Sequence, residues 1–213
     1  MLKVRGLLQA SHFIPTLIVT SIAFAFGTYY WWEGPAYVIA FTVFTGQLIV
    51  GWSNDLYDFA DDKRHVRMNK PLVSGLISVS YLRKWLIFMV PFSFAANIFG
   101  PLGIKGGLLY WLGIGCGVAY NFYFKFNVLS PLPYAVAFAA LPSCIAISKS
   151  VTPPTWMWLG GAILGCAAHF INVIKDMDQD RESSIKGLPQ RIGKRGSIAV
   201  AAGLVLTAAL VIC

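Results

Sequence analysis

Asparagine and aspartate recur at four-residue intervals in two segments of the chain. Both segments follow the spacing N-x3-D-x3-D: the first ladder is Asn54, Asp58 and Asp62, and the second ladder is Asn172, Asp176 and Asp180. On a helix, side chains four residues apart lie on one face, so each set converges. Converging carboxylates repel one another strongly at low dielectric and need cations beside them. The two ladders therefore predict a divalent-metal site.

Magnesium suits this pattern, because Mg²⁺ binds one or two carboxylates, keeps water ligands and takes the rest from substrate phosphates. Two ladders that face each other would bracket a diphosphate. The expected metal ligands are Asp55, Asp58 and Asp62 for one ion and Asp176 and Asp180 for the other. Nearby bases that could donate to phosphate oxygens are Arg67, Lys70, Arg181 and Lys186. Asp61 and Asp178 lie off the main faces, and His169 is expected to pack inside the protein.

The elements that carry the ladders are apolar. Hydrophobic residues make up 57% of the chain, charged residues 12%, and the mean hydropathy is +0.65. Soluble domains carry about a quarter charged residues, so the composition predicts an integral membrane protein. Several apolar runs approach the roughly 20 residues that a membrane-spanning helix needs. We expect an all-α, multi-pass bundle of about seven spans, near residues 13–32, 35–53, 85–99, 106–124, 129–148, 155–174 and 197–213.

Basic residues alternate with these runs. Fifteen of the 17 Lys and Arg residues fall in the segments on one side, and only Lys105 and Lys149 fall on the other. This bias predicts that the N-terminus and both ladders are cytoplasmic, in the plasma membrane if the organism is prokaryotic. The net charge of +8 follows the loops and does not indicate a nucleic-acid partner; membrane lipids are the expected surroundings.

The ladders end the second and the sixth run, and this four-span offset indicates a tandem duplication of a four-helix unit. An eighth run is missing, so we expect one domain over residues 1–213 that lacks C-terminal helices. The N-terminal segment has no small-residue cleavage site after a short apolar core, and the first span is expected to be retained.

Several motifs resemble the UbiA superfamily of intramembrane prenyltransferases, in particular its 4-hydroxybenzoate polyprenyltransferases. Residues 54–62 read NDLYDFADD and match its NDxxDxxxD motif, and residues 176–180 read DMDQD and match its DxxxD motif. Tyr120 and Lys125 are similar to its Y-x4-K, and residues 67–78 and 181–193 resemble the segments after the two acidic motifs. One departure is His12, which stands where an Arg often begins the first span.

The resemblance implies Mg²⁺-dependent transfer of a prenyl group from an allylic prenyl diphosphate to an aromatic or lipid acceptor, as in quinone biosynthesis. It implies catalytic roles for Asp58, Asp176 and Lys125. The implied substrate-binding residues are Asn54, Arg67, Lys70, Tyr120, Lys125, Asn172 and Arg181.

Two alternatives remain open. Some members of the superfamily transfer phosphoribose to a polyprenyl phosphate, and the motifs do not exclude that reaction. A non-catalytic protein that binds or transports a divalent ion is the other alternative. Transport predicts acidic residues spread across the depth of the membrane, whereas eight of the nine acidic residues here lie on one side.

Overall fold

The computed structural model describes residues 2–183 and 185–213, except for the side chains of Gln179 and Arg181. The described residues form helices joined by short turns, with no strand among them. The helices are α1 (Leu2–Ala10), α2 (Phe13–Tyr30), α3 (Glu33–Arg64), α4 (Val79–Phe99), α5 (Gly103–Phe122), the 3₁₀ turn η1 (Phe124–Phe126), α6 (Leu132–Ser148), α7 (Thr155–Glu182) and α8 (Leu188–Ile212).

The long helices α2 to α8 coincide with the seven apolar runs, which confirms an all-α, multi-pass bundle. Five of them, α2, α3, α4, α7 and α8, are long and apolar enough to cross a membrane. Helix α6 has only 17 residues, so the count of seven spans stays a prediction. The chain is an integral membrane protein.

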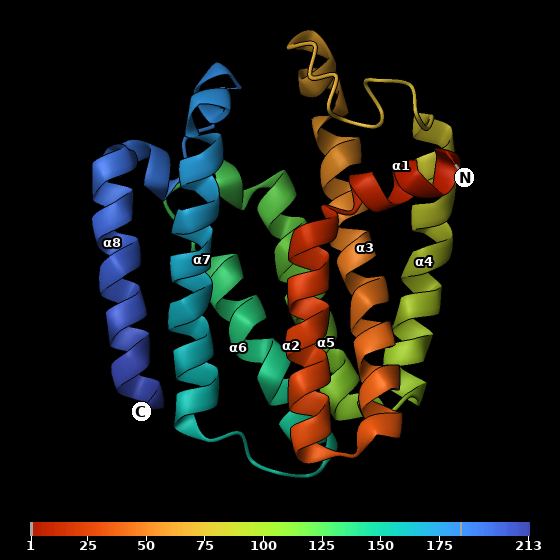
Figure 1. Ribbon diagram of the computed structural model, residues 1–213, viewed down its shortest axis with the longest axis vertical. Coiled ribbons are helices and arrows are strands. Elements are labelled where there is room, and N and C mark those ends of the chain that lie inside the picture. Colours follow the sequence, from red (N-terminus) through yellow and green to blue (C-terminus); the bar gives the residue numbers. More distant parts are fainter. Residues whose placement is uncertain (1, 184) are drawn as a thin grey trace.

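Helices α3 and α7 run in the same direction and carry their ladders to the same end of the bundle (Figure 1). We call this the ladder end; the N-terminus and the crosswise helix α1 also lie there, whereas the C-terminus lies at the opposite end. Lys105 at the start of α5 and Lys149 at the end of α6 lie at the opposite end. The charge bias read from the sequence therefore separates the two ends of the molecule.

Both ladders lie on helices, as their four-residue spacing predicts. The apolar runs end near residues 53 and 174, but α3 continues to Arg64 and α7 continues to Glu182. No Gly or Pro interrupts either extension. In α3, the Asn54 amide donates to the Asp58 carboxylate across one turn, and Lys63 and Arg64 lie in the last turn, where the helix dipole favours cations.

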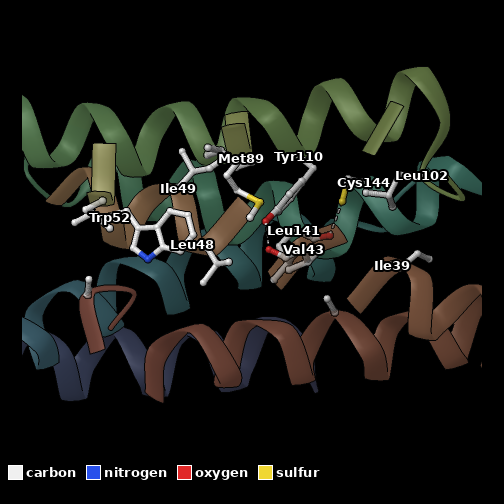
Figure 2. Packing of buried hydrophobic residues seen from close by; sticks show 14 of the residues in the cluster. Ile39, Val43, Leu48, Ile49, Trp52, Met89, Leu102, Tyr110, Leu141 and Cys144 are labelled. Carbon is white, nitrogen blue, oxygen red and sulfur yellow. Dashed lines mark hydrogen bonds between the residues drawn. The ribbon is translucent and has the colours of Figure 1, made fainter. Parts of the chain in front are cut away.

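Helix α3 forms the centre of the bundle, because it packs against α2, α4 and α5. Its buried face includes Ile39, Val43, Ile49 and Trp52 (Figure 2). The Tyr110 hydroxyl of α5 donates a hydrogen bond of 2.7 Å to the Val43 carbonyl. Burying apolar side chains around one helix holds it in a fixed position, and so it fixes the first ladder at its end.

The corner between α1 and α2 packs directly on α3. His12 turns the chain there with a left-handed backbone (φ 52). Gly51 faces the corner, and a Cβ at this position would lie 2.6 Å from the carbonyl of Ser11. Only glycine permits this approach. The contact brings the His12 side chain to the first ladder.

Candidate functional site

A cavity of about 920 Å³ opens at the ladder end between α3 and α7. Both ladders line it, because Asn54 and Asp58 face it from α3, and Asn172 and Asp176 face it from α7. The other ladder residues, Asp62 and Asp180, line it as well. The two four-residue spacings, 118 positions apart in sequence, thus meet across a single space.

Each acidic residue of the first motif contacts a basic side chain. Lys125 Nζ lies 2.5 Å from Asp58 Oδ1, and Arg67 Nη1 lies 2.7 Å from Asp62 Oδ1. Charge-assisted hydrogen bonds of this length are strong at low dielectric. Arg67 also approaches Asp61: its Nη1 lies 3.6 Å from Asp61 Oδ2. Three of the cations that the sequence singled out, Arg67, Lys70 and Lys125, are therefore in contact with acidic residues of the first motif.

Asp55 differs from its neighbours. It is 2% exposed, it is not among the residues that line the cavity, and its Oδ1 lies 2.8 Å from Lys70 Nζ. His12 Nε2 approaches the same oxygen at 3.5 Å. Burial alone would lower the pKa of Lys70, but the charge and hydrogen bond of Asp55 and the charge of Asp62 raise it overall. In this arrangement Asp55 is a buried counter-charge for Lys70, and its role as a metal ligand stays a prediction.

The second ladder lacks such compensation. In the described part of the chain, no hydrogen bond or ion pair reaches the Asp176 carboxylate, and Asp180 accepts only a 2.6 Å hydrogen bond from Gln190. Burial and the charge of Asp176 raise the pKa of Asp180, which lies beyond the membrane-spanning part of α7, to about 6. Two acidic side chains that face a cavity and pair with no basic side chain among the described residues have the donor chemistry for a divalent ion.

The described residues contain no cluster of three His, Cys, Asp or Glu side chains arranged to hold a metal by themselves. Mg²⁺ does not require such a cluster, because it uses one or two carboxylates and completes its shell with water and substrate phosphates. The ladders would each supply such a partial shell: Asn54 and Asp58 from α3, and Asp176 and Asp180 from α7.

The charges around the cavity balance. Of the described residues that line it, five are acidic and five are basic: Asp58, Asp61, Asp62, Asp176 and Asp180, against Arg64, Arg67, Lys70, Lys125 and Lys175. A polyanion that enters this cavity must therefore bring its own compensating cations.

Asp61 and Arg67 connect the two ladders. Asp61 lies off the main face of the ladder, and it also lines the cavity. Its carboxylate accepts a hydrogen bond from Ser183, which follows α7, and Arg67 Nη2 donates to the same hydroxyl at 2.8 Å. Burial lowers the pKa of Arg67, but the hydrogen bond and charge of Asp62 and the charge of Asp61 raise it overall.

Of the remaining predicted residues, some line the cavity or pack inside the bundle, and others are exposed. Tyr120 lines the cavity beside Tyr134, with ring centroids 5.1 Å apart. His169 packs inside as expected, since it is 1% exposed and its Nε2 lies 3.0 Å from Ser130 Oγ. Lys186 and Asp178 are exposed and do not line the cavity. The side chain of Arg181 lies outside the described residues.

Three residues at the site were not singled out from the sequence. Ser183 and Gln190 bond to Asp61 and Asp180, and Lys175 lines the cavity. Uncharged side chains in a polar loop carry no sequence signal of their own. Lys175 could have been found, because it lies three residues after Asn172 and thus near the second-ladder face.

Comparisons with known proteins agree with this geometry. The chain is 28% identical over 191 residues to digeranylgeranylglyceryl phosphate synthase of Natronomonas pharaonis, which covers 81% of this chain. The chain spans 63% of the length of that relative.

Solved structures share the fold. A UbiA homologue from Archaeoglobus fulgidus, bound to GPP and Mg²⁺, superimposes with a TM-score of 0.80 at 18% identity, over 97% of this chain and 76% of that one. The apo structure of a UbiA homologue from Aeropyrum pernix gives a TM-score of 0.72 at 17% identity, with 97% and 76% covered. The sequence model of the UbiA prenyltransferase family matches residues 13–213. Because this match covers 201 of the 213 residues, the chain belongs to the UbiA prenyltransferase family.

Proposed function

We propose that the protein transfers a prenyl group from an allylic prenyl diphosphate to an acceptor within the membrane, in a reaction that depends on Mg²⁺. The observation that carries this proposal is the pair of ladders that face one cavity. The N. pharaonis relative is named as a synthase of a prenylated glyceryl phosphate, and A. fulgidus homologues are described with GPP or DMAPP and Mg²⁺.

The charge balance supports a metal-dependent donor. The lining carboxylates and cations of the described residues already cancel, so a diphosphate would enter as an excess of negative charge. Divalent ions between Asn54 and Asp58 on one side and Asp176 and Asp180 on the other would remove that excess. Bound Mg²⁺ would act as a Lewis acid that neutralises the departing diphosphate.

The basic residues of the cavity would hold the diphosphate oxygens. Lys125 is 6% exposed and is fixed by Asp58, so its ammonium group is preorganised to donate to the leaving group. Lys70 and Arg67 are held by Asp55 and Asp62 in the same way. Preorganised donors that meet charge as it develops supply a large part of catalysis in many enzymes.

The aromatic side chains suit an allylic cation. Tyr120, Tyr134 and Tyr57 line the cavity, and the Tyr57 ring already lies 5.0 Å from Lys125 Nζ. The negative faces of such rings attract a cation. When the C–O bond of the donor breaks, the electron pair leaves with the diphosphate, and the acceptor attacks C1 and loses a proton. The bundle would exclude water from the cation.

The acceptor is aromatic or lipid, and the cytoplasm is the side from which the donor enters. The Lys and Arg bias between the two ends of the bundle supports this orientation, and the plasma membrane is its place in a prokaryote. Phosphoribosyl transfer to a polyprenyl phosphate is the second candidate for the same cavity, because its donor is also a diphosphate. A transporter is disfavoured, because the acidic residues gather at one end.

The proposal is tested with the purified protein in lipid nanodiscs. Labelled geranyl and geranylgeranyl diphosphates are supplied with Mg²⁺ and a panel of aromatic and glyceryl phosphate acceptors. Formation of a Mg²⁺-dependent lipid product that is lost in Asp58→Asn and Asp176→Asn supports prenyl transfer. Consumption of phosphoribosyl diphosphate with polyprenyl phosphate, and of no prenyl donor, would assign the second candidate instead.

A further inference from the structure

A second, apolar cavity of about 220 Å³ adjoins the large one, deeper in the bundle. Its walls come from α2, α3, α5, α6, α7 and α8, with apolar residues such as Ile22, Leu141 and Leu164. Five residues line both cavities, so the two spaces are contiguous: Val19, Gln47, Gly113, Ala137 and Phe138. A hydrocarbon chain that starts at the ladders can continue into this space.

Gln47 is the one polar side chain among the described residues that line both cavities. It precedes Asn54 by seven residues on α3, which places it on nearly the same helix face, two turns or about 10.5 Å deeper. The lining residues Val50 and Gly51 lie between them. Gln47 thus stands at the boundary where the polar face of α3 ends and the apolar cavity begins.

Tyr110 holds the amide of Gln47 in place. The Gln47 Nε2 donates a long hydrogen bond of 3.5 Å to the Tyr110 hydroxyl, which itself donates to the Val43 carbonyl at 2.7 Å; Figure 2 shows Tyr110 directed at Val43. Gly46 permits this contact, because any side chain there would collide with the Tyr110 hydroxyl. In the described part of the chain the Gln47 side chain makes no other hydrogen bond, and the residue lines both cavities.

We propose that Gln47 determines the length of the prenyl chain that the site accepts; this inference rests on the proposed function. A peptide residue of three backbone bonds spans at most about 3.3–3.6 Å, so a four-bond isoprene unit spans roughly 4.5–5 Å. A donor whose diphosphate lies between the ladders therefore reaches Gln47 after about two isoprene units. A longer chain must extend past the Gln47 amide and displace the water that hydrogen-bonds to it.

Extending past the Gln47 amide costs binding free energy only for long donors. A polar group that loses its water without a new partner destabilises the bound state. A geranyl tail ends before the amide and leaves it solvated. A geranylgeranyl tail covers it and fills the apolar cavity beyond. Gln47 thereby disfavours chains longer than about two units, and an apolar side chain of similar size would remove this discrimination.

The test measures Mg²⁺-dependent binding of geranyl and geranylgeranyl diphosphate to the protein in nanodiscs by titration calorimetry. Gln47→Leu and Gln47→Met should bind the longer donor about tenfold more tightly than the wild type does, as expected for relief of one buried unpaired group. Their affinity for geranyl diphosphate should change less than twofold. Tyr110→Phe removes the hydroxyl that pairs with the amide, so one more amide atom lacks a partner when a long donor covers it; the ratio of affinities should shift in the opposite direction, toward geranyl diphosphate, by about threefold.

Gln47→Asn retains an amide and serves as the matched control, with an unchanged preference expected. If the wild type binds both donors but the ratio of affinities is the same in all four variants, the length proposal is overturned while the proposed function stands. If the wild type binds neither donor with Mg²⁺, both are overturned together.

Discussion

At the scale of single residues, the site consists of charges that stabilise one another before any ligand enters. Asp58 holds Lys125, Asp62 holds Arg67, and Asp55 holds Lys70. The second ladder has no such partner in the described part of the chain, and the raised pKa of Asp180 reflects burial and the charge of Asp176. This asymmetry indicates that the first ladder holds basic side chains in place, whereas the second ladder has no basic partner among the described residues.

Lys125→Met should lower kcat for prenyl transfer by about 100-fold or more, because a preorganised donor to the leaving group is lost. The control is Lys175→Met, which removes an exposed lysine that lines the same cavity and should change kcat less than tenfold. Steady-state kinetics with saturating donor compares the two. Equal losses in both variants would mean that the cavity only attracts anions by its overall charge.

Lys70→Met should destabilise the fold. It leaves the carboxylate of Asp55, which is 2% exposed, without its main partner, and breaking a buried pair in this way costs about 3–5 kcal/mol. Asp55→Asn combined with Lys70→Met should recover most of the loss, since no buried charge remains. Thermal unfolding in a mild detergent measures both. A double variant as unstable as the single one would show that the ion pair is not the cause.

At the scale of the elements, α3 and α7 extend beyond their apolar parts and hold the ladder side chains there. The contact of Gly51 with the backbone of Ser11 couples the α1–α2 corner to α3 and sets His12 beside Asp55. The site thus depends on a helix contact that contains no functional group.

Gly51→Ala tests this contact. A Cβ there would lie 2.6 Å from the Ser11 backbone, so the corner must move, at a cost of about 1–3 kcal/mol. We expect a lower melting temperature and weaker donor binding. Gly115→Ala on α5 adds the same methyl group where nothing lies within 4 Å, and it should leave both quantities unchanged. If Gly115→Ala also weakened donor binding, the contact at the α1–α2 corner would not be the cause of the effect.

The elements also show what sequence can and cannot predict. The seven apolar runs located the seven long helices, because hydropathy sums over many residues. The apolar runs stop short of the helical ends that carry the ladders, since the polar residues 54–64 end the hydropathy signal although they continue the helix, and only the four-residue spacing indicated a helix there. The motif spacing predicted that Asn54, Asp58, Asn172 and Asp176 act together, and they do line one cavity. The burial of Asp55 and the Ser183 bridge depend on how α3, α7 and their loops pack, which spacing does not encode.

At the scale of the whole molecule, the bundle separates a charged end from an apolar one. Both ladders, η1 and most basic residues lie at the ladder end, and an apolar cavity continues inward from it (Figure 1). A donor with a charged head and a hydrocarbon tail has the same polarity along its length. The fold therefore matches its proposed substrate in shape as well as in charge.

The orientation of the bundle can be measured with single cysteines in a variant whose four native cysteines are replaced by alanine. Lys186→Cys at the ladder end should be protected from an impermeant maleimide added outside intact cells, because its flanking loops are basic. Lys105→Cys at the opposite end should be labelled. Lysed cells provide the control in which both react. Labelling of Lys186→Cys in intact cells would reverse the orientation.

The most direct measurement of the central claim is the affinity for geranyl diphosphate with and without Mg²⁺, in the wild type, Asp176→Asn and Asp178→Asn. Both substitutions remove one charge from α7, but only Asp176 lines the cavity. We expect Mg²⁺ to strengthen binding at least tenfold in the wild type and in Asp178→Asn, and Asp176→Asn to lose most of this gain. Equal Mg²⁺ dependence in all three proteins would contradict a metal-bridged diphosphate between the ladders.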